Sequence, residues 1–258
     1  AVYCEDFGDG RAFVDAAAQA SRAGKPVLVL TGGGSEASIP GGQSHTGSLT
    51  SDSAVIDAAC RAAGVYRVSS PRQLADVAAT LLGYGPAAVR RVGVVADGGG
   101  HAGVASDVVE AGGLTVPEFP ADISGALRDL VPPSAGVTNP VDLAGAGEQD
   151  ITSFVSVLDA ILQSPAVDSV LLTGYFGGYG SYGENLARNE IETARAMAET
   201  ARAHGKPVVV HTMHPDSAAA RVLADSGVPV FRAVEDAAGA LGVIAETAAP
   251  LHQASMDG

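Results

Sequence analysis

The sequence contains no tryptophan, only two cysteines and only two lysines among its 258 residues. Cys4 and Cys60 cannot form a disulfide framework and lack the spacing of a zinc site, so we expect two buried structural thiols. No apolar run approaches the roughly 18 residues of a membrane helix, and no basic segment followed by an apolar stretch opens the chain. We therefore predict neither a membrane span nor a secretory signal, and we expect a cytoplasmic protein.

Basic residues are scarce in general. Lys and Arg together number 15 against 29 Asp and Glu, which gives a formal net charge of −14. This balance argues against nucleic acid or an anionic membrane as partner, because both bind basic surfaces. Hydrophobic residues make up 47% and charged residues 17%, which excludes a disordered chain and allows a sizeable core. Because the chain starts without Met in an apolar run, we expect a segment of a longer protein.

Short apolar runs alternate with Ala-rich helical patterns along the chain. The apolar runs predict buried parallel strands at 27–30, 92–96, 170–173 and 208–211. The helical patterns cover 9–23, 51–63, 71–82, 102–111, 152–163 and 184–203. This alternation predicts an α/β fold with doubly wound parallel sheets, in which ligands bind at the carboxyl ends of the strands.

Both lysines stand in the tetrapeptide Gly-Lys-Pro-Val, at 24–27 and 205–208. In each case glycine suits the end of the preceding helix, and proline stops that helix before a strand. A second strand and a further helix follow each copy, with the strands at 65–68 and 228–231. A helix–strand–helix–strand–helix unit therefore occurs twice, which indicates duplication of a flavodoxin-like unit. With the seam at residues 83–86, we expect three-layer domains at 1–85 and 86–258.

The two copies differ in length. The interval from Gly24 to Gly64 is 40 residues, whereas that from Gly205 to Gly227 is 22. Most of the excess is a glycine-rich stretch at 31–50 that follows the carboxyl end of a predicted strand. Long loops at such places are usually functional.

His45 is the residue of this stretch that titrates near neutral pH. A histidine can serve as base, metal ligand or nucleophile. A metal site is a poor fit because Glu36 is the only other ligand type nearby, so a nucleophilic histidine fits best. The alternative is an exposed loop histidine without a function.

Two further glycine clusters follow predicted strands, at Gly98–Gly100 and at Gly177–Gly178. Backbone N–H groups at the start of a helix favour anions, so each cluster is a candidate phosphate loop. The alternative for each is a tight strand-to-helix turn. The first cluster lacks the glycine spacing and the following acid of a dinucleotide site, so an NAD-dependent dehydrogenase is not supported.

Four other polar residues lie near predicted strand ends. Glu5 could orient an imidazole from a neighbouring loop, or it could be a solvated acid. His211 and His214 could line a cleft, although a metal site there would need a third ligand that the sequence does not offer. Asp142 reads as a local cap in a turn that feeds a helix.

Taken in order, these segments resemble the NDP-forming acyl-CoA synthetases, which include the ADP-forming acetate–CoA ligases and are related to succinyl-CoA synthetase. The resemblance runs from residue 1 to about residue 247. The motifs that carry it are Gly-Lys-Pro-Val at 24–27, Gly-Gly-Gln-Ser-His-Thr-Gly-Ser-Leu at 41–49, Ala-Gly-Val-Tyr-Arg-Val at 63–68, Asp-Gly-Gly-Gly-His-Ala-Gly-Val at 97–104, Asn-Pro-Val-Asp-Leu at 139–143, Phe-Gly-Gly-Tyr at 176–179 and Gly-Lys-Pro-Val-Val-Val-His-Thr-Met at 205–213.

The resemblance implies a role for each candidate. His45 would be phosphorylated and would move between an acyl-CoA site and a nucleotide site, and Glu5 would hydrogen-bond its imidazole. Gly177 and Gly178 would open a helix whose N-terminus stabilises the phosphohistidine. The remaining residues that the resemblance assigns are Gly98, Gly99 and Gly100 in a secondary phosphate or structural loop, and Ser44, Thr46 and Gly47 as support around the histidine.

The implied reaction converts acyl-CoA and phosphate into an acyl phosphate and CoA. The acyl phosphate then phosphorylates the histidine, which passes the phosphoryl group to ADP. The family also implies partners: a CoA-binding Rossmann domain and an ATP-grasp domain or subunit, which would bind most of the CoA and of the ADP or ATP with Mg²⁺. No prosthetic group is expected.

Because those domains and the first strands of the first ligase domain are not in this sequence, the chain alone should not complete a turnover. The acyl group stays open. The alternative function is a non-catalytic module of the same fold, used for assembly or regulation.

Overall fold

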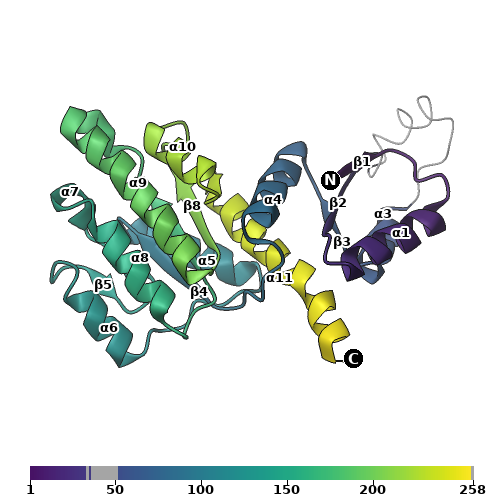
Figure 1. Ribbon diagram of the computed structural model, residues 1–258, viewed down its shortest axis with the longest axis horizontal. Helices are drawn as coiled ribbons and strands as arrows, with labels where there is room; N and C mark the ends of the chain where they lie inside the picture. Colours follow the sequence, from purple (N-terminus) through teal and green to yellow (C-terminus); the bar gives the residue numbers. More distant parts are fainter. Residues whose placement is uncertain (33–34, 36–51, 257–258) are drawn as a thin grey trace.

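In this computed structural model, residues 1–32, 35 and 52–256 are described, and their strands form two separate sheets (Figure 1). The smaller sheet has the order β1-β2-β3, and both of its strand pairs are parallel. Its elements are β1 (Val2–Cys4), α1 (Gly10–Arg22), β2 (Val27–Thr31), α3 (Ser53–Ala62), β3 (Val65–Val68) and α4 (Pro71–Tyr84).

The larger sheet has six strands in the order β5-β6-β4-β7-β8-β9. Its strands are β4 (Val92–Ala96), β5 (Gly136–Val137), β6 (Val141–Asp142), β7 (Ser169–Gly174), β8 (Val208–Thr212) and β9 (Val230–Phe231). The expectation of parallel sheets holds for all pairs except β5 with β6, which is antiparallel. The three residues between these two strands are too few for a parallel crossover, which needs a dozen or more.

Helices cover both faces of the larger sheet. They are α5 (Gly99–Ala111), α6 (Ala121–Arg128), α7 (Ala146–Gln149), α8 (Ser153–Gln163), the 3₁₀ turn η1 (Tyr179–Tyr182), α9 (Glu184–His204), α10 (Ala218–Asp225) and α11 (Val234–Met256). Within the described part of the chain, none of the helices combines the length and the apolar character that crossing a membrane requires.

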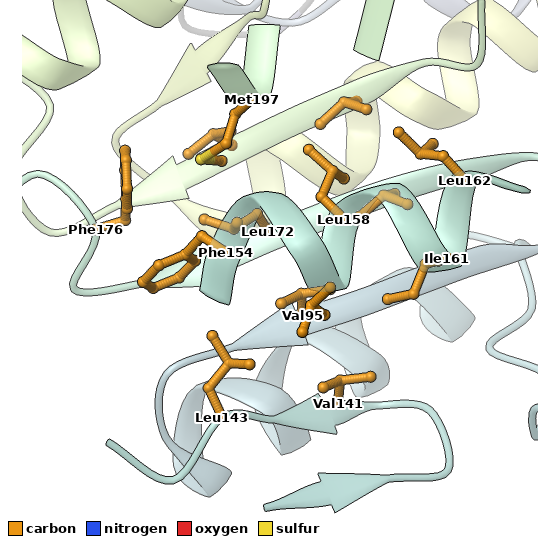
Figure 2. Close-up of a cluster of buried hydrophobic side chains, with 14 of the residues drawn as sticks. Val95, Val141, Leu143, Phe154, Leu158, Ile161, Leu162, Leu172, Phe176 and Met197 are labelled. Atoms are coloured by element: carbon orange, nitrogen blue, oxygen red, sulfur yellow. The ribbon is translucent and has the colours of Figure 1, made fainter. Parts of the chain in front are cut away.

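Alternating strand residues separate the two layers of core. Leu172 faces a cluster that includes Phe154, Leu158 and Ile161 of α8 and residues of α9, as Figure 2 shows. Its neighbour Leu171 faces the opposite cluster, to which α5 and α11 contribute. The β7 strand is buried along its whole length because both faces are covered, which explains its continuous apolar run.

The helix–strand–helix–strand–helix order deduced from the two lysines is present twice. The first unit is α1-β2-α3-β3-α4, and the second unit is α9-β8-α10-β9-α11. The helix before each Gly-Lys-Pro-Val ends beside a glycine with positive φ, 74° at Gly24 and 65° at Gly205. That left-handed conformation is costly for residues with a side chain, so the tetrapeptide encodes the same helix end in both places.

The two units meet through α4 and α11, which pack against one another. Val243 of α11 joins Leu28 of β2 and Val77 of α4 in one buried cluster. At the end of α4, the Tyr84 hydroxyl donates to the carbonyl oxygen of Val208 at 2.9 Å, and burial raises the pKa of Tyr84 to about 12. The two units are therefore linked by packing and by a partly buried hydrogen bond.

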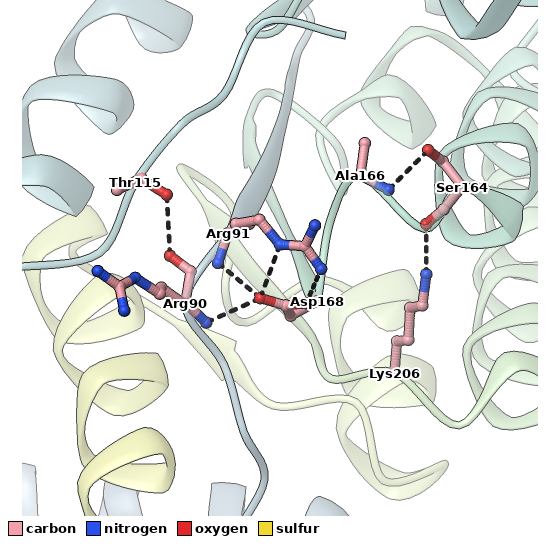
Figure 3. A network of polar contacts seen from close by, with 7 residues as sticks. All are labelled: Arg90, Arg91, Thr115, Ser164, Ala166, Asp168 and Lys206. Atoms are coloured by element: carbon pink, nitrogen blue, oxygen red, sulfur yellow. Dashed lines mark hydrogen bonds and ion pairs between the residues drawn. The ribbon is translucent and has the colours of Figure 1, made fainter. Parts of the chain in front are cut away.

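The amino ends of β4, β7 and β8 carry a polar network (Figure 3). Asp168 accepts the backbone N–H groups of Arg90 and Arg91 and binds the Arg91 guanidinium at 2.6 Å. Although burial opposes it, this set of donors lowers the pKa of Asp168. Lys206, the second of the two lysines, donates from Nζ to the carbonyl oxygen of Ser164 at 2.6 Å. These residues stabilise the edge of the sheet opposite the one where ligands are expected.

Candidate functional site

The carboxyl end of β2 leads into the stretch that the sequence singled out. Strand β2 ends at Thr31 and α3 begins at Ser53. His45 lies between them, together with Ser44, Thr46 and Gly47, and these four residues are outside the described part of the structure. Their predicted roles therefore remain predictions. The structure describes the residues at the two ends of the segment, Thr31 and Ser53, and the side chains that contact them.

Glu5 lies at the start of this segment. It follows β1 and is exposed, and its Oε1 accepts the hydroxyl of Tyr3 at 2.9 Å. The backbone passes close to it at Gly32, where an added Cβ would be 3.7 Å from Glu5 Cγ and 3.3 Å from the Tyr3 hydroxyl. The carboxylate is thus next to the first residue of the histidine segment and accessible to a group arriving from it.

Arg67 on β3 holds both ends of the segment, and sequence reasoning missed it. Its Nε donates to Oγ1 of Thr31 at 2.9 Å, and its Nη1 donates to Oγ of Ser53 at 2.8 Å and to the Ser53 carbonyl oxygen at 3.2 Å. The same Nη1 is 2.8 Å from Oδ1 of Asp57. A signal was present, since an arginine inside a short, otherwise apolar strand needs partners.

The carboxyl edge of the larger sheet centres on Asp97, directly after β4. Its side chain is 4% exposed, and Oδ2 accepts the N–H of Tyr175 at 2.7 Å and the hydroxyl of Tyr179 at 3.2 Å. Burial raises the pKa of Asp97 despite these bonds. Gly174 makes room for it, because an added Cβ there would be 2.0 Å from Asp97 Oδ1. This carboxylate is therefore a fixed internal group of the edge.

The Gly177–Gly178 loop surrounds a second buried carboxylate, that of Glu190 on α9. Glu190 is 3% exposed. Its Oε1 accepts the N–H of Gly177 at 2.6 Å and of Tyr179 at 3.1 Å, and its Oε2 accepts the N–H of Gly180 at 3.0 Å. The N–H of Gly178 donates to the Tyr175 carbonyl oxygen at 2.9 Å. The loop has the geometry of an anion nest, and its amides already bind an anion of this chain.

Glu190 was not found from the sequence, although a signal existed. The buried residues of α9 fall at 190, 193, 194, 197, 198 and 201, which is the spacing of one helix face. A glutamate within such a face is unusual, because an ionised carboxylate is costly to bury without partners. The three amides of the preceding glycine loop are those partners.

The Gly98–Gly100 cluster forms the start of α5, as expected from the turn pattern. Gly98 is the N-cap and makes no side-chain cap bond, and α5 begins at Gly99, earlier than the sequence suggested. Asp142 faces this helix end, because an added Cβ at Gly99 would be 3.1 Å from Asp142 Oδ2. Asp142 Oδ1 also accepts the N–H of Ala144 at 2.9 Å, which is the local cap role expected for it.

The histidines of this edge have separate surroundings. His211 Nδ1 is 2.7 Å from Oγ1 of Thr173, and burial together with the charge of His101 lowers the pKa of His211. His214 stacks edge-on against Tyr175 with ring centroids 4.6 Å apart. Its Nε2 is buried without a hydrogen-bond partner and faces Gly178, where an added Cβ would be 2.5 Å away. Among the described residues, no group of three or more His, Cys, Asp or Glu side chains is arranged to hold a metal ion.

The two cysteines have no catalytic surroundings. Cys60 is 4% exposed in the core between α1, α3 and the smaller sheet, and burial raises the pKa of its thiol. Cys4, in strand β1, is only partly buried, so the expectation of full burial is wrong for this residue. Its position in an edge strand, paired on one side with β2, explains the difference.

Family sequence models match nearly the whole chain. The model described as succinyl-CoA ligase like flavodoxin domain matches residues 1–81, and the model described as Ligase-CoA domain matches residues 92–249. The chain belongs to the Ligase-CoA family. This confirms the resemblance to NDP-forming acyl-CoA synthetases that the motifs indicated.

Curated members of the family extend beyond the length of this chain. The 4-hydroxybutyrate–CoA ligase [ADP-forming] of Nitrosopumilus maritimus is 27% identical over 92% of this chain and 33% of its own length. The acetate–CoA ligase [ADP-forming] II subunit alpha of Pyrococcus furiosus is 27% identical over 96% of this chain and 53% of its own length. The chain thus spans between a third and about half of these relatives.

Solved structures show the same fold. The dinucleotide forming acetyl-coenzyme A synthetase 1 of Ca. Korarchaeum cryptofilum, in complex with phosphate and ADP, superposes with a TM-score of 0.81 at 22% identity. The match covers 99% of this chain and 54% of that one. The α/β architecture with flavodoxin-like units predicted from the sequence is thereby confirmed.

Proposed function

We propose that this chain is the ligase part of an NDP-forming acyl-CoA synthetase and that His45 carries the phosphoryl group during the reaction. The observation that supports this most directly is the match of both family models in chain order, with His45 in the long segment between β2 and α3. The curated relatives are named as ADP-forming CoA ligases, which favours an enzyme over a non-catalytic module.

The proposed reaction has three balanced steps. Phosphate attacks the acyl carbon of acyl-CoA, and CoA leaves with formation of an acyl phosphate. The imidazole of His45 takes the phosphoryl group and releases the carboxylic acid. ADP then takes the phosphoryl group from the histidine and becomes ATP. Such transfers depend on positioning and on stabilisation of charge, and backbone amides of glycine loops can provide the latter.

Glu5 is the proposed partner of the His45 imidazole. Its carboxylate is exposed at the carboxyl end of β1 and next to Gly32, where the histidine segment starts. A carboxylate that accepts one ring N–H fixes the imidazole tautomer and leaves the other nitrogen free to attack phosphorus. Ser44, Thr46 and Gly47 are proposed to support the loop around the histidine.

The backbone amides of the glycine loops are proposed to bind the phosphoryl group. At one of the two loops these amides already have acceptors within the chain. At Gly177, Gly178 and their neighbours the amides already donate within the chain, three of them to Glu190. A phosphoryl group at this loop would therefore share or exchange these donors with Glu190. Gly98, Gly99 and Gly100 form the open start of α5 and are a secondary candidate, with the Asp142 carboxylate nearby.

The remaining parts of the proposal concern the whole protein. CoA, ADP or ATP and Mg²⁺ are substrates held mainly by a CoA-binding domain and an ATP-grasp domain or subunit. We place the division between the two ligase domains near residue 85, where α4 has ended at Tyr84 and β4 has not begun. The small carboxylic acid and phosphate complete the reactants, and a reaction that uses these metabolites fits the cytoplasm.

The test is to incubate the full-length enzyme with Mg²⁺ and ATP labelled at the γ-phosphate. We expect an acid-labile phosphohistidine that is absent from His45→Ala. The control is His204→Ala, which changes a histidine at the end of α9 that pairs with Asp159 and should keep the label. Equal labelling of wild type and His45→Ala would exclude His45 as the carrier. A full-length protein that takes no label at all and has no acyl-CoA synthetase activity would favour the non-catalytic module.

A further inference from the structure

The guanidinium of Arg67 bridges the two ends of the histidine segment. Thr31 is the last residue of β2 and Ser53 the first of α3, and both accept hydrogen bonds from Arg67 between 2.8 and 3.2 Å. The arginine side chain is 18% exposed, so these contacts are largely shielded from water. A planar guanidinium has donors in fixed directions and can hold two anchors at a defined separation.

Asp57 completes the arrangement. Its Oδ1 is 2.8 Å from Nη1 of Arg67, so the partly buried positive charge has an opposite charge beside it. Asp57 belongs to α3, the helix that begins at Ser53, and Arg67 therefore binds the helix through two residues a turn apart. Through these contacts Arg67 holds the first turn of α3 next to the last residue of β2.

The duplicated unit provides an internal comparison. The strand register pairs Val29 with Arg67 in the first unit and Val210 with Val230 in the second. The spacing from the preceding glycine is also the same, from Gly64 to Arg67 and from Gly227 to Val230. The second unit thus has valine where the first has arginine.

The segment that connects the first strand of each unit to the following helix is long in the first unit and short in the second. In the second unit β8 ends at Thr212 and α10 begins at Ala218, so the ends are joined by a short turn and need no clamp. There the Thr212 hydroxyl donates to the carbonyl oxygen of Phe176 instead. An arginine at this register position therefore accompanies the long segment and is replaced where the segment is short.

We propose that Arg67 is a positioning residue that sets the separation and orientation of the two ends of the 32–52 segment, and so the place from which His45 reacts. This inference rests on the proposed function for its catalytic consequence, whereas the clamp itself is independent of that function. Displacement of a reacting group by about 1 Å can reduce a rate about 100-fold, so a loosened segment should slow phosphoryl transfer strongly.

The experiment compares full-length Arg67→Met and Arg67→Lys with wild type. Methionine keeps an apolar stem and removes every donor, whereas lysine keeps the charge and can hold one anchor at a time. We expect Arg67→Met to lower the single-turnover rate of His45 phosphorylation on the order of 10- to 100-fold, with the KM for ATP changed less than about twofold. Arg67→Lys should recover part of the rate.

A matched control is Arg232→Met, which removes an arginine paired with Asp216 beside the corresponding strand of the second unit. It should leave the phosphorylation rate within about twofold of wild type. If Arg67→Met does not fold, Thr31→Val and Ser53→Ala remove one anchor each and should give intermediate rates. Rates within twofold of wild type for Arg67→Met, or for both anchor variants together, would overturn the proposal.

Hydrogen–deuterium exchange separates this inference from the proposed function. If wild type takes no label on His45, the proposed function fails, and exchange in the first turn of α3, which begins at Ser53, then decides on the clamp alone. We expect faster exchange there in Arg67→Met and unchanged exchange in Arg232→Met. Equal exchange in wild type and Arg67→Met would overturn the clamp.

Discussion

The first and second units have the same order of helices and strands, but the side chains at the carboxyl ends of their strands make different contacts. In both, a glycine with positive φ ends the first helix, and Lys-Pro leads into a parallel strand. In the second unit the side chains of Glu190 and Thr212 at this edge have hydrogen-bond partners within the protein. In the first unit Glu5 is exposed, and an arginine holds the ends of a long segment. The comparison shows two sheet edges built by the same order of elements, whose polar side chains make different contacts.

The largest expected effect comes from removing the buried carboxylate of Glu190 in the second unit. Glu190→Ala leaves the N–H groups of Gly177, Tyr179 and Gly180 without their acceptor in a buried place. We expect the free energy of unfolding to fall by about 3–5 kcal/mol, measured by urea denaturation. The counterpart in the first unit is Asp9, which caps α1 through the N–H groups of Arg11 and Ala12 on the surface.

Asp9→Ala should cost only about 1 kcal/mol, because an exposed cap can be replaced by water. Similar losses for the two variants would contradict the view that the buried amides around Glu190 depend on its carboxylate as their acceptor.

A smaller effect is expected where the units touch. An added Cβ at Gly83 in α4 would be 2.8 Å from the carbonyl oxygen of Gly227, a backbone atom that cannot move aside easily. We expect Gly83→Ala to destabilise the protein by about 1–2 kcal/mol in a thermal or urea unfolding experiment, even though alanine favours a helix. Gly239→Ala in α11 is the control, because nothing lies within 4 Å of its added Cβ.

The control should gain about 0.5–1 kcal/mol. Stabilisation by both substitutions would show that Gly83 has room for a methyl group beside the carbonyl oxygen of Gly227.

The smallest expected effect is a pH dependence of stability that comes from His211 in the second unit. Burial lowers the pKa of His211, and Leu30 stands at the equivalent place in the first unit. Because the folded protein resists protonation here, the contribution of His211 to stability is complete above the unfolded pKa of about 6.5 and declines as the pH falls below it. We expect wild type to lose more stability between pH 7.5 and 5.5 than His211→Asn, whose amide can keep a bond to Thr173.

Urea unfolding at the two pH values measures this difference. The effect should be smaller than those of Glu190→Ala and Gly83→Ala. An identical loss in the two proteins would mean that other groups account for the acid sensitivity.

Much of the fold could be predicted because its strands and helices follow from local patterns of apolar residues. The strands at 92–96, 170–173 and 208–211 are continuous apolar runs, and the structure places each in the larger sheet within a residue or two. The β5–β6 hairpin was missed because its strands have two residues each, too short for any periodicity. Asn139 in its turn bonds to Val94 N–H and to the Val92 carbonyl oxygen, a long-range contact that no local pattern reveals.

The candidate site was predictable in part for a different reason. Glycine clusters and strand ends mark where ligands can approach, so Glu5, Gly98–Gly100 and Gly177–Gly178 could be named from position. The residues that hold these loops, Glu190 and Arg67, act across distances in sequence of 10 to 36 residues. These contacts are set by the tertiary packing of helices and strands, which cannot be predicted from the local patterns of a single sequence.

Helix α11 has a consequence for how the chain folds. It covers one face of the larger sheet, and Val243 also completes the core of the first unit with Leu28 and Val77. Neither unit can therefore lose its structure without exposing apolar surface of the other. Unfolding should follow a single cooperative transition in spite of the two sheets, and a truncation before Val234 should destabilise the N-terminal sheet as well as the C-terminal one.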